Sequence, residues 1–135
     1  MIIKINPDLE KAKSIYGLVQ SRKSAMPSLK QVSFPTVVAE NYYEIIKGLI
    51  GINLLADNFK AIGVNVHRDL IEKFSKYTTL NNQEIATIQD LRIKRNKSLY
   101  EGKQIEGIYI NNNEKKLMEI VLKLENYTIK RLGEK

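Results

Sequence analysis

The sequence predicts an all-α fold, an antiparallel bundle of four to five helices that forms one domain over residues 1–135. Apolar residues recur with a helical period in five segments, and residues that typically begin or end helices separate these segments. No segment alternates strictly between apolar and polar residues, apart from possible short extended pieces at Ile2–Ile5 or Ile108–Ile110. A chain of 135 residues has the size of one domain and can bury a core without disulfides.

The first two predicted helices are joined by a loop through "KQVSFP", residues 30–35. Asn6 can cap the first helix, Pro7 suits its first position, and Asp8 and Glu10 complement its dipole. We expect this helix to end within "AMPSL", residues 25–29. The second helix, residues 36–62, is apolar nearly all round in its middle and is therefore predicted to be the buried central helix.

Three further helices are predicted from caps and apolar stripes. Gly63 fits the C-terminal cap of the second helix, and Asn65 can cap the third. In "LNNQE", Asn81 and Glu84 form a capping box that begins a fourth helix, from residue 83 to about residue 100. After a loop that includes "YINNN", the fifth helix carries the stripe Leu117, Ile120, Val121, Leu124, Thr128 and Leu132.

Composition excludes several classes of function. The absence of cysteine rules out disulfides and thiolate chemistry and is consistent with a reducing cytoplasm, and a single histidine, His67, argues against a metal centre. The longest apolar run, "IIKGLIGINLLA", is about half the length of a spanning helix, and "MIIKIN" is too short for a secretory signal. We expect a cytoplasmic protein with no membrane segment, metal or cofactor.

The chain is strongly basic, with a net charge of +7 and a pI near 9.5. Such an excess favours polyanionic partners such as RNA, DNA or nucleotides, but a solvated cationic surface explains it equally well unless the charges cluster. The glycines are scattered and form no phosphate-binding loop, and no Ser/His/Asp set is recognisable.

Basic residues do cluster in "LRIKRNKSLYEG", residues 91–102 of the fourth helix. Arg92 and Arg95 fall at the spacings of the apolar stripe and lie one turn apart, so together they could hold a phosphodiester. Asn96 could orient a phosphate oxygen or a 2′-hydroxyl. The alternative is that both arginines pair with carboxylates or helix ends inside the bundle. The candidate nucleotide- or RNA-binding residues are Arg92, Arg95, Asn96, Lys97 and Tyr100.

The segment "ENYYEIIKGLIGINLLADNFKAIGVNVHRDLIEKF" followed by "EIATIQDLRIKRNKSLYEG" resembles the HEPN family, the higher eukaryote and prokaryote nucleotide-binding domains. The resemblance covers roughly residues 36–102. It aligns the arginine of the family's motif with Arg95, the following polar residue with Asn96, and the motif histidine with Tyr100. In HEPN ribonucleases, the resemblance implies, two such motifs face each other across a homodimer and cleave RNA without metal through attack of the 2′-hydroxyl.

The tyrosine at position 100 divides the functional hypotheses, because a phenol with a reference pKa near 10 is a poor base at neutral pH. The favoured hypothesis is a non-catalytic HEPN-like module that binds nucleotide, RNA or a partner nucleotidyltransferase, as in a toxin-antitoxin system. The alternative is a metal-independent, toxin-like ribonuclease in which Arg95 stabilises charge and Tyr100 or Glu101 moves protons. A third possibility is a helical dimer whose arginines are purely structural.

His67 and the two adjacent tyrosines of the second helix are further candidates for contact with a ligand. His67 could face the same cleft as the arginines, but a helix-start packing residue is the preferred interpretation. Tyr42 and Tyr43 could stack on a base; Tyr42 fits the apolar stripe and is assigned to the core.

Overall fold

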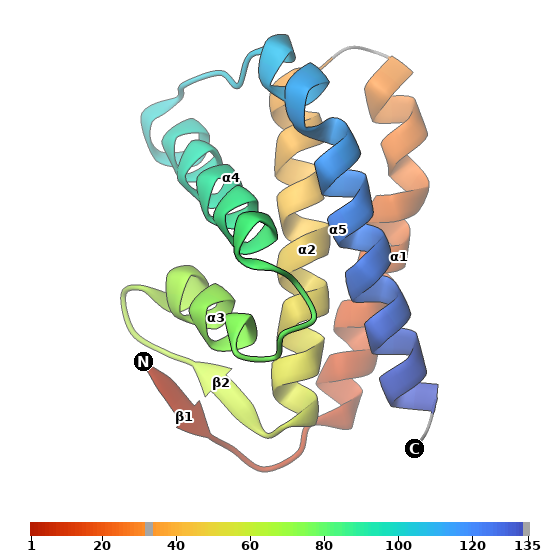
Figure 1. The fold of residues 1–135 in the computed structure, drawn as a ribbon, viewed down its shortest axis with the longest axis vertical. Coiled ribbons are helices and arrows are strands. Elements are labelled where there is room, and N and C mark those ends of the chain that lie inside the picture. The colour runs from red at the N-terminus through yellow and green to blue at the C-terminus, as the bar shows by residue number, and fades with distance from the viewer. Residues whose placement is uncertain (32–33, 134–135) are drawn as a thin grey trace.

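The computed structural model describes residues 1–31 and 34–133, and over these residues the predicted all-α bundle is confirmed, with one small two-stranded sheet added (Figure 1). No helix of this described part is both long and apolar enough to cross a membrane. The elements are β1 (Ile2–Lys4), α1 (Leu9–Gln31), α2 (Pro35–Ala56), β2 (Phe59–Ala61), α3 (Val66–Ser75), α4 (Asn82–Glu101) and α5 (Gly107–Gly133).

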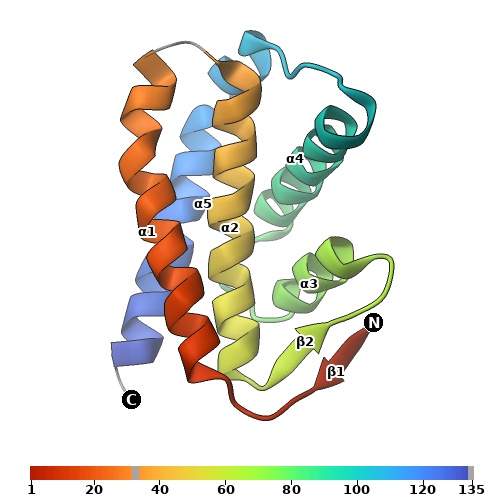
Figure 2. The ribbon, with the colours of Figure 1, turned by 180° about the vertical axis from the view of Figure 1, so that it is seen from behind.

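Helix α2 is the central element, as its apolar sequence predicts. Helices α1 and α5 lie along one side of it, and helices α3 and α4 pack against another (Figures 1 and 2). Helix α1 runs antiparallel to α2, whereas α5 runs in the same direction as α2. The fully buried side chains of α2 include Tyr43, Ile45, Ile46, Leu49, Ile50, Ile52 and Leu54. Of the polar residues of α2, Glu40 and Glu44 face α4, whereas Asn41 contacts α1 and Asn53 contacts α5.

Helix α1 differs from the prediction at both ends. Asp8 rather than Asn6 caps it, because the Asp8 Oδ1 atom accepts a hydrogen bond of 3.0 Å from the Lys11 amide. The predicted end within residues 25–29 is wrong, since the helix continues through Pro27 to Gln31. Pro27 removes one helical hydrogen bond, but Met26 and Leu29 pack into the core on either side of it, and this burial outweighs the loss.

The expected loop at residues 30–35 is shorter than predicted. Its first two residues belong to α1 and Pro35 begins α2, while residues 32 and 33 lie outside the described part of the chain.

The predicted end of the second helix is also wrong. Helix α2 stops at Ala56, and Asn58 adopts a left-handed conformation with φ of 65°, which asparagine tolerates better than most residues. Residues 59–61 then pair antiparallel with residues 2–4, so the predicted extended piece at the N-terminus is confirmed as β1. Gly63, with φ of 98°, forms the turn after β2 instead of capping a helix.

The starts of α3 and α4 follow the sequence closely. Asn65 occupies the N-cap of α3, although its side chain makes no capping hydrogen bond. The capping box of α4 is confirmed: Asn81 Oδ1 accepts from the Glu84 amide at 2.8 Å, and the Asn81 amide donates to Glu84 at 3.0 Å. Gly102, with φ of 68°, ends α4 in the left-handed conformation that favours glycine.

Helix α5 begins earlier than predicted. It starts at Gly107, so "YINNN" is helical, and the alternative extended piece at residues 108–110 is wrong. The linker before it is fixed by Thr36, whose hydroxyl accepts from the amide of the buried Ile105 at 2.8 Å. This anchor lets the helix begin immediately after the linker. Of the predicted stripe, Leu132 is half-buried and the other five residues are buried.

Candidate functional site

A polar cleft of about 260 Å³ lies where the first turn of α3 faces α4. It brings together four of the five residues predicted from the sequence, whereas Lys97 lies outside it. No carboxylate is among the residues that line it within the described chain. The lining residues are Val64, Asn65, Val66, His67, Arg68, Arg92, Arg95, Asn96 and Tyr100.

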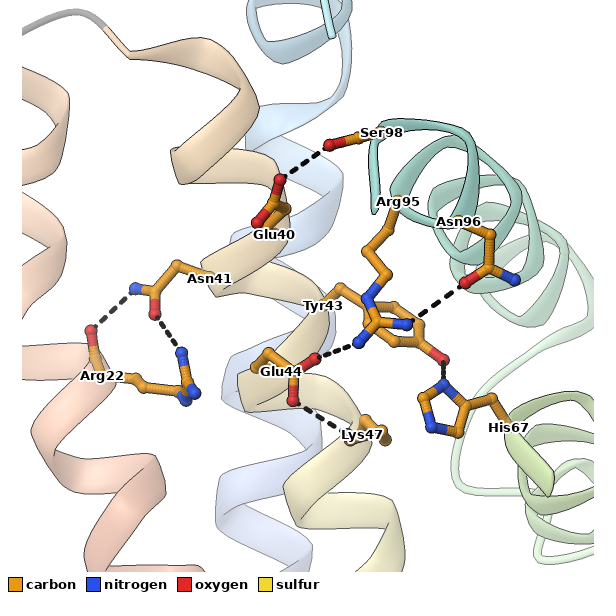
Figure 3. A network of polar contacts seen from close by, with 10 residues as sticks. All are labelled: Arg22, Glu40, Asn41, Tyr43, Glu44, Lys47, His67, Arg95, Asn96 and Ser98. Atoms are coloured by element: carbon orange, nitrogen blue, oxygen red, sulfur yellow. Dashed lines mark hydrogen bonds and ion pairs between the residues drawn. The ribbon is translucent and has the colours of Figure 1, made fainter. Parts of the chain in front are cut away.

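Arg95 is fixed in place by α2 (Figure 3). Its side chain is only 15% exposed, and its guanidinium donates to Glu44 at 3.0 Å and to Asn96 at 3.2 Å. The guanidinium carbon also lies 5.3 Å from the centre of the Tyr43 ring. Arg95 thus pairs with a carboxylate of α2, as one of the two alternatives expected of both arginines, and it still lines the cleft.

Arg92 has a different environment from Arg95. Its Nε atom donates to Gln89 at 2.7 Å, and within residues 1–31 and 34–133 no carboxylate pairs with it. Arg68 contributes a third guanidinium from α3, with long contacts of 3.8 Å to Asp69 and 4.0 Å to Glu72. Two of the three arginines of the cleft therefore keep charge available for an anion.

His67 also lines the cleft, and it is anchored by a buried tyrosine. The Tyr43 hydroxyl lies 3.1 Å from His67 Nδ1, and Tyr43 is fully buried (Figure 3). Burial lowers the pKa of His67, as do the positive charges of Lys47 and Arg95, while burial raises the pKa of Tyr43 well above its usual range. The Tyr43 hydroxyl and His67 Nδ1 share a hydrogen bond, and the tautomer of the neutral imidazole decides which of the two donates.

His67 accordingly combines the two roles that the sequence suggested, packing against the core and lining the cleft. The assignment of Tyr42 to the core is confirmed, because its side chain is almost completely buried. Tyr43 is buried as well, so neither tyrosine offers an open ring face for a base.

Glu44 of α2 holds the guanidinium of Arg95 in place at the cleft. It accepts from Arg95 at 3.0 Å and from Lys47 at 2.8 Å. Burial alone would raise the pKa of Glu44, but the hydrogen bond and charge of Lys47, together with the charge of Arg95, hold it below its ordinary value. A second tie joins the same helices, because the Ser98 hydroxyl donates to Glu40 at 2.8 Å. These contacts hold α4 at a fixed distance and rotation on α2.

Tyr100 stands at the outer edge of the cleft, and its side chain is 76% exposed. Arg92, Asn96 and Tyr100 follow one another at single-turn spacing along α4, as predicted from the sequence. Glu101 is exposed in the last turn of α4 and does not line the cleft. Any proton transfer by Tyr100 would therefore take place at a solvent-exposed position.

Three features of the site were not predicted from the sequence. These are Arg68 as a third guanidinium, Glu44 as the partner of Arg95, and the contact between Tyr43 and His67. The adjacent "HR" in the first turn of α3 was the available signal for Arg68. Comparisons of the chain with models of known protein families, with curated proteins and with solved structures found no match.

Proposed function

We propose that this chain is a HEPN-like module that binds the phosphate groups of RNA or nucleotides in the cleft between α3 and α4, without strong catalytic activity. The proposal rests on one observation. Three arginines line a single cleft, and within the described chain no carboxylate is among its lining residues. A guanidinium binds phosphate through two parallel hydrogen bonds, and Arg92 retains its terminal nitrogens for this purpose.

Two further features of the cleft suit an anion. The first amides of α3 border it and the Asn65 side chain does not cap them, so they can donate to an anion, although Asp69 in the same turn offsets part of the positive end of the helix dipole. The volume of about 260 Å³ is below the roughly 300–1,000 Å³ of typical small-molecule pockets. A phosphate with part of its sugar fits such a volume better than a whole dinucleotide does.

The resemblance to HEPN domains supplies the context of the proposal. It implies a homodimer and, in some systems, a partner nucleotidyltransferase or a toxin-antitoxin pair. The replacement of the motif histidine by Tyr100 favours binding over cleavage, because a phenol rarely loses its proton at neutral pH.

A metal-independent ribonuclease is the second candidate, and the position of His67 favours it. An imidazole shares the cleft with Arg95, Asn96 and Tyr100, so a group that exchanges protons near neutral pH is within the site. Its lowered pKa keeps it neutral at pH 7. In this candidate Arg95 stabilises the charge that develops on the phosphate, and Tyr100 or His67 moves protons.

Binding of labelled single-stranded RNA tests the proposal. Arg92→Gln should weaken binding about tenfold, as expected for the loss of one charge-assisted contact, and should reduce the salt slope by about 0.7. Lys13→Gln is the matched control, since it removes the same charge from an exposed position on α1, and it should change binding little. Equal effects of the two variants would show that binding depends on overall charge and not on the cleft.

Incubation of RNA with the protein in EDTA separates the two candidates. We expect little cleavage by the wild type, and Tyr100→His is the variant in which some activity should appear if the rest of the catalytic site is intact. Strong cleavage by the wild type that Arg95→Ala and Tyr100→Phe abolish would replace the binding module with the ribonuclease.

A further inference from the structure

A second basic cleft, of about 330 Å³, lies on the other side of α4, where the linker enters α5. Three lysines line it together with one carboxylate, that of Glu106. Within residues 1–31 and 34–133 none of these lysines takes part in an ion pair. The lining residues are Lys94, Lys97, Lys103, Gln104, Ile105, Glu106, Ile108 and Tyr109.

Two features distinguish this cleft from an ordinary solvated surface. The Tyr109 hydroxyl is buried and has no hydrogen-bond partner within the described chain, and the Lys94 ammonium lies 5.2 Å from the centre of the Tyr109 ring. The first turn of the long helix α5 forms one wall and contains no acidic residue, and Glu106, directly before the helix, is the one carboxylate at its positive end. Three lysines and a helix N-terminus thus lie together, with the Tyr109 ring beneath Lys94.

Helix α4 separates this lysine cleft from the arginine cleft. Residues 92, 95, 96 and 100 face the arginine cleft, and residues 94 and 97 face the lysine cleft. An α-helix with its side chains is about 10–12 Å across, so one phosphate cannot occupy both clefts. A ligand with several phosphates in a chain can reach both by crossing the helix.

The surface of α4 between the two clefts suits bases as well as phosphates. Ile93 is 45% exposed there, and Tyr100 presents most of its ring at the edge of the arginine cleft. Proteins that bind single strands without sequence preference combine a basic path for the backbone with aromatic side chains on which bases stack.

We propose that the lysine cleft is a second phosphate subsite and that the ligand is a single-stranded polynucleotide whose backbone crosses α4 from one cleft to the other. This inference rests on the proposed function and deepens it, because it replaces a mononucleotide with a polynucleotide. Lys94, Lys97 and Lys103 bind the phosphates that follow or precede the one held by Arg92.

The test compares ligands of increasing length. Affinities would be measured for UMP and for oligouridylates up to about ten nucleotides, within the range of site sizes known for single-strand binders. The triple variant Lys94→Gln/Lys97→Gln/Lys103→Gln should bind the long oligomer at least about tenfold more weakly, with a salt slope lower by about 1–2, and should bind UMP as the wild type does. The matched control is Lys13→Gln/Lys116→Gln/Lys130→Gln, which removes the same charge from exposed positions on α1 and α5.

Each alternative outcome is decisive. If UMP binds as tightly as the long oligomer and the two triple variants behave alike, the second subsite is wrong, while weakening by Arg92→Gln would keep the proposed function. If Arg92→Gln changes nothing and no oligomer binds, the proposed function itself fails. A duplex that binds as tightly as the single strand would overturn the single-stranded assignment. Thermal unfolding of both triple variants should stay close to that of the wild type, because five of the six lysines are exposed and the half-buried Lys94 contacts only the Tyr109 ring among the described interactions.

Discussion

The cleft between α3 and α4 and the groove between α1 and α5 use basic residues in opposite ways. The groove has a volume of about 710 Å³ and an apolar floor that includes Met26, Ile45 and Val121. Two of its lysines face carboxylates across it: Lys23 pairs with Glu125, and Lys30 lies 3.4 Å from Glu114. In the cleft, by contrast, Arg92 has no carboxylate partner within the described residues.

This difference shows that the placement of carboxylates decides which basic region can bind an anion. A net charge of +7 alone does not distinguish the two regions. In the groove the opposing charges of α1 and α5 cancel, and what remains is apolar surface. In the cleft Glu44 of α2 pairs with Arg95 and Lys47, Arg68 has only the long contacts to Asp69 and Glu72, and Arg92 has no carboxylate partner within the described residues.

The largest expected effect is on the molecular mass in solution, and the experiment decides which of the two regions forms a dimer contact. The resemblance implies a homodimer in which the two α4 helices approach each other. Leu99 on α4 is 53% exposed and Leu122 in the groove is 59% exposed, so they form a matched pair. By light scattering at tens of micromolar, Leu99→Glu should reduce the mass to that of one 15.5 kDa chain, and Leu122→Glu should not.

The assembly prediction fails in either of two ways. A wild type that is monomeric at this concentration would remove the dimer altogether. Dissociation by Leu122→Glu alone would move the contact to the groove between α1 and α5.

The next effect is on stability. Arg95→Ala should lower the free energy of unfolding by about 1–3 kcal/mol, because it removes a largely buried charge-assisted hydrogen bond and leaves Glu44 with Lys47 alone. Lys30→Ala in the groove breaks a more exposed pair and should cost about 0–1 kcal/mol. Urea unfolding measures both, and equal losses would show that the two regions do not differ in how firmly they hold their charges.

A smaller effect concerns the pKa of His67, the only histidine of the chain. Its imidazole should titrate by NMR below the reference value of about 6.5, because of burial and the neighbouring positive charges. The unfolded chain then binds this proton more readily, so the contribution of His67 to stability is present above about pH 6.5 and is lost as the pH falls. An anion in the cleft should raise the pKa, since negative charge favours the imidazolium.

The control for this prediction is a variant that removes the contact between Tyr43 and His67. Tyr43→Phe removes the hydroxyl that is hydrogen-bonded to His67 Nδ1 and should leave the response to an anion intact. A His67 pKa at or above the reference value in the free protein would contradict the electrostatic description of the cleft.

The smallest expected effect is on the stability of Arg92→Gln. Because Arg92 donates, among the residues that the structure describes, only to Gln89 on its own helix, the free energy of unfolding should change by no more than about 0.5 kcal/mol. Differential scanning calorimetry would check it. A loss as large as that of Arg95→Ala would mean that both arginines are structural.

Much of the fold could be predicted from local sequence signals. The capping box of Asn81 and Glu84, the apolar character of α2 and the stripe of α5 depend on residues close together in the chain. The errors arose where distant contacts decide the local structure. Residues 59–61 continue an apolar helical pattern, but pairing with residues 2–4 makes them a strand, and Pro27 is tolerated because its neighbours are buried.

The candidate site was predicted in part for the same reason. Helical spacing places Arg92, Asn96 and Tyr100 in one row without knowledge of the rest of the molecule. The distinction between a structural Arg95 and an open Arg92 depends on Glu44, which is 51 residues away in the chain. Spacing on one helix cannot reveal which carboxylate of another helix will face it.

Backbone amide shift mapping during titration with UMP tests the central claim most directly, because it reports on the cleft and the groove in one experiment. The account predicts that the largest shifts cluster at residues 64–68 and 92–100, on both walls of the cleft. It predicts no significant shifts at residues 114–125 of the groove, although lysines are present there as well. Shifts concentrated in the groove, or none in the cleft at millimolar UMP, would contradict it.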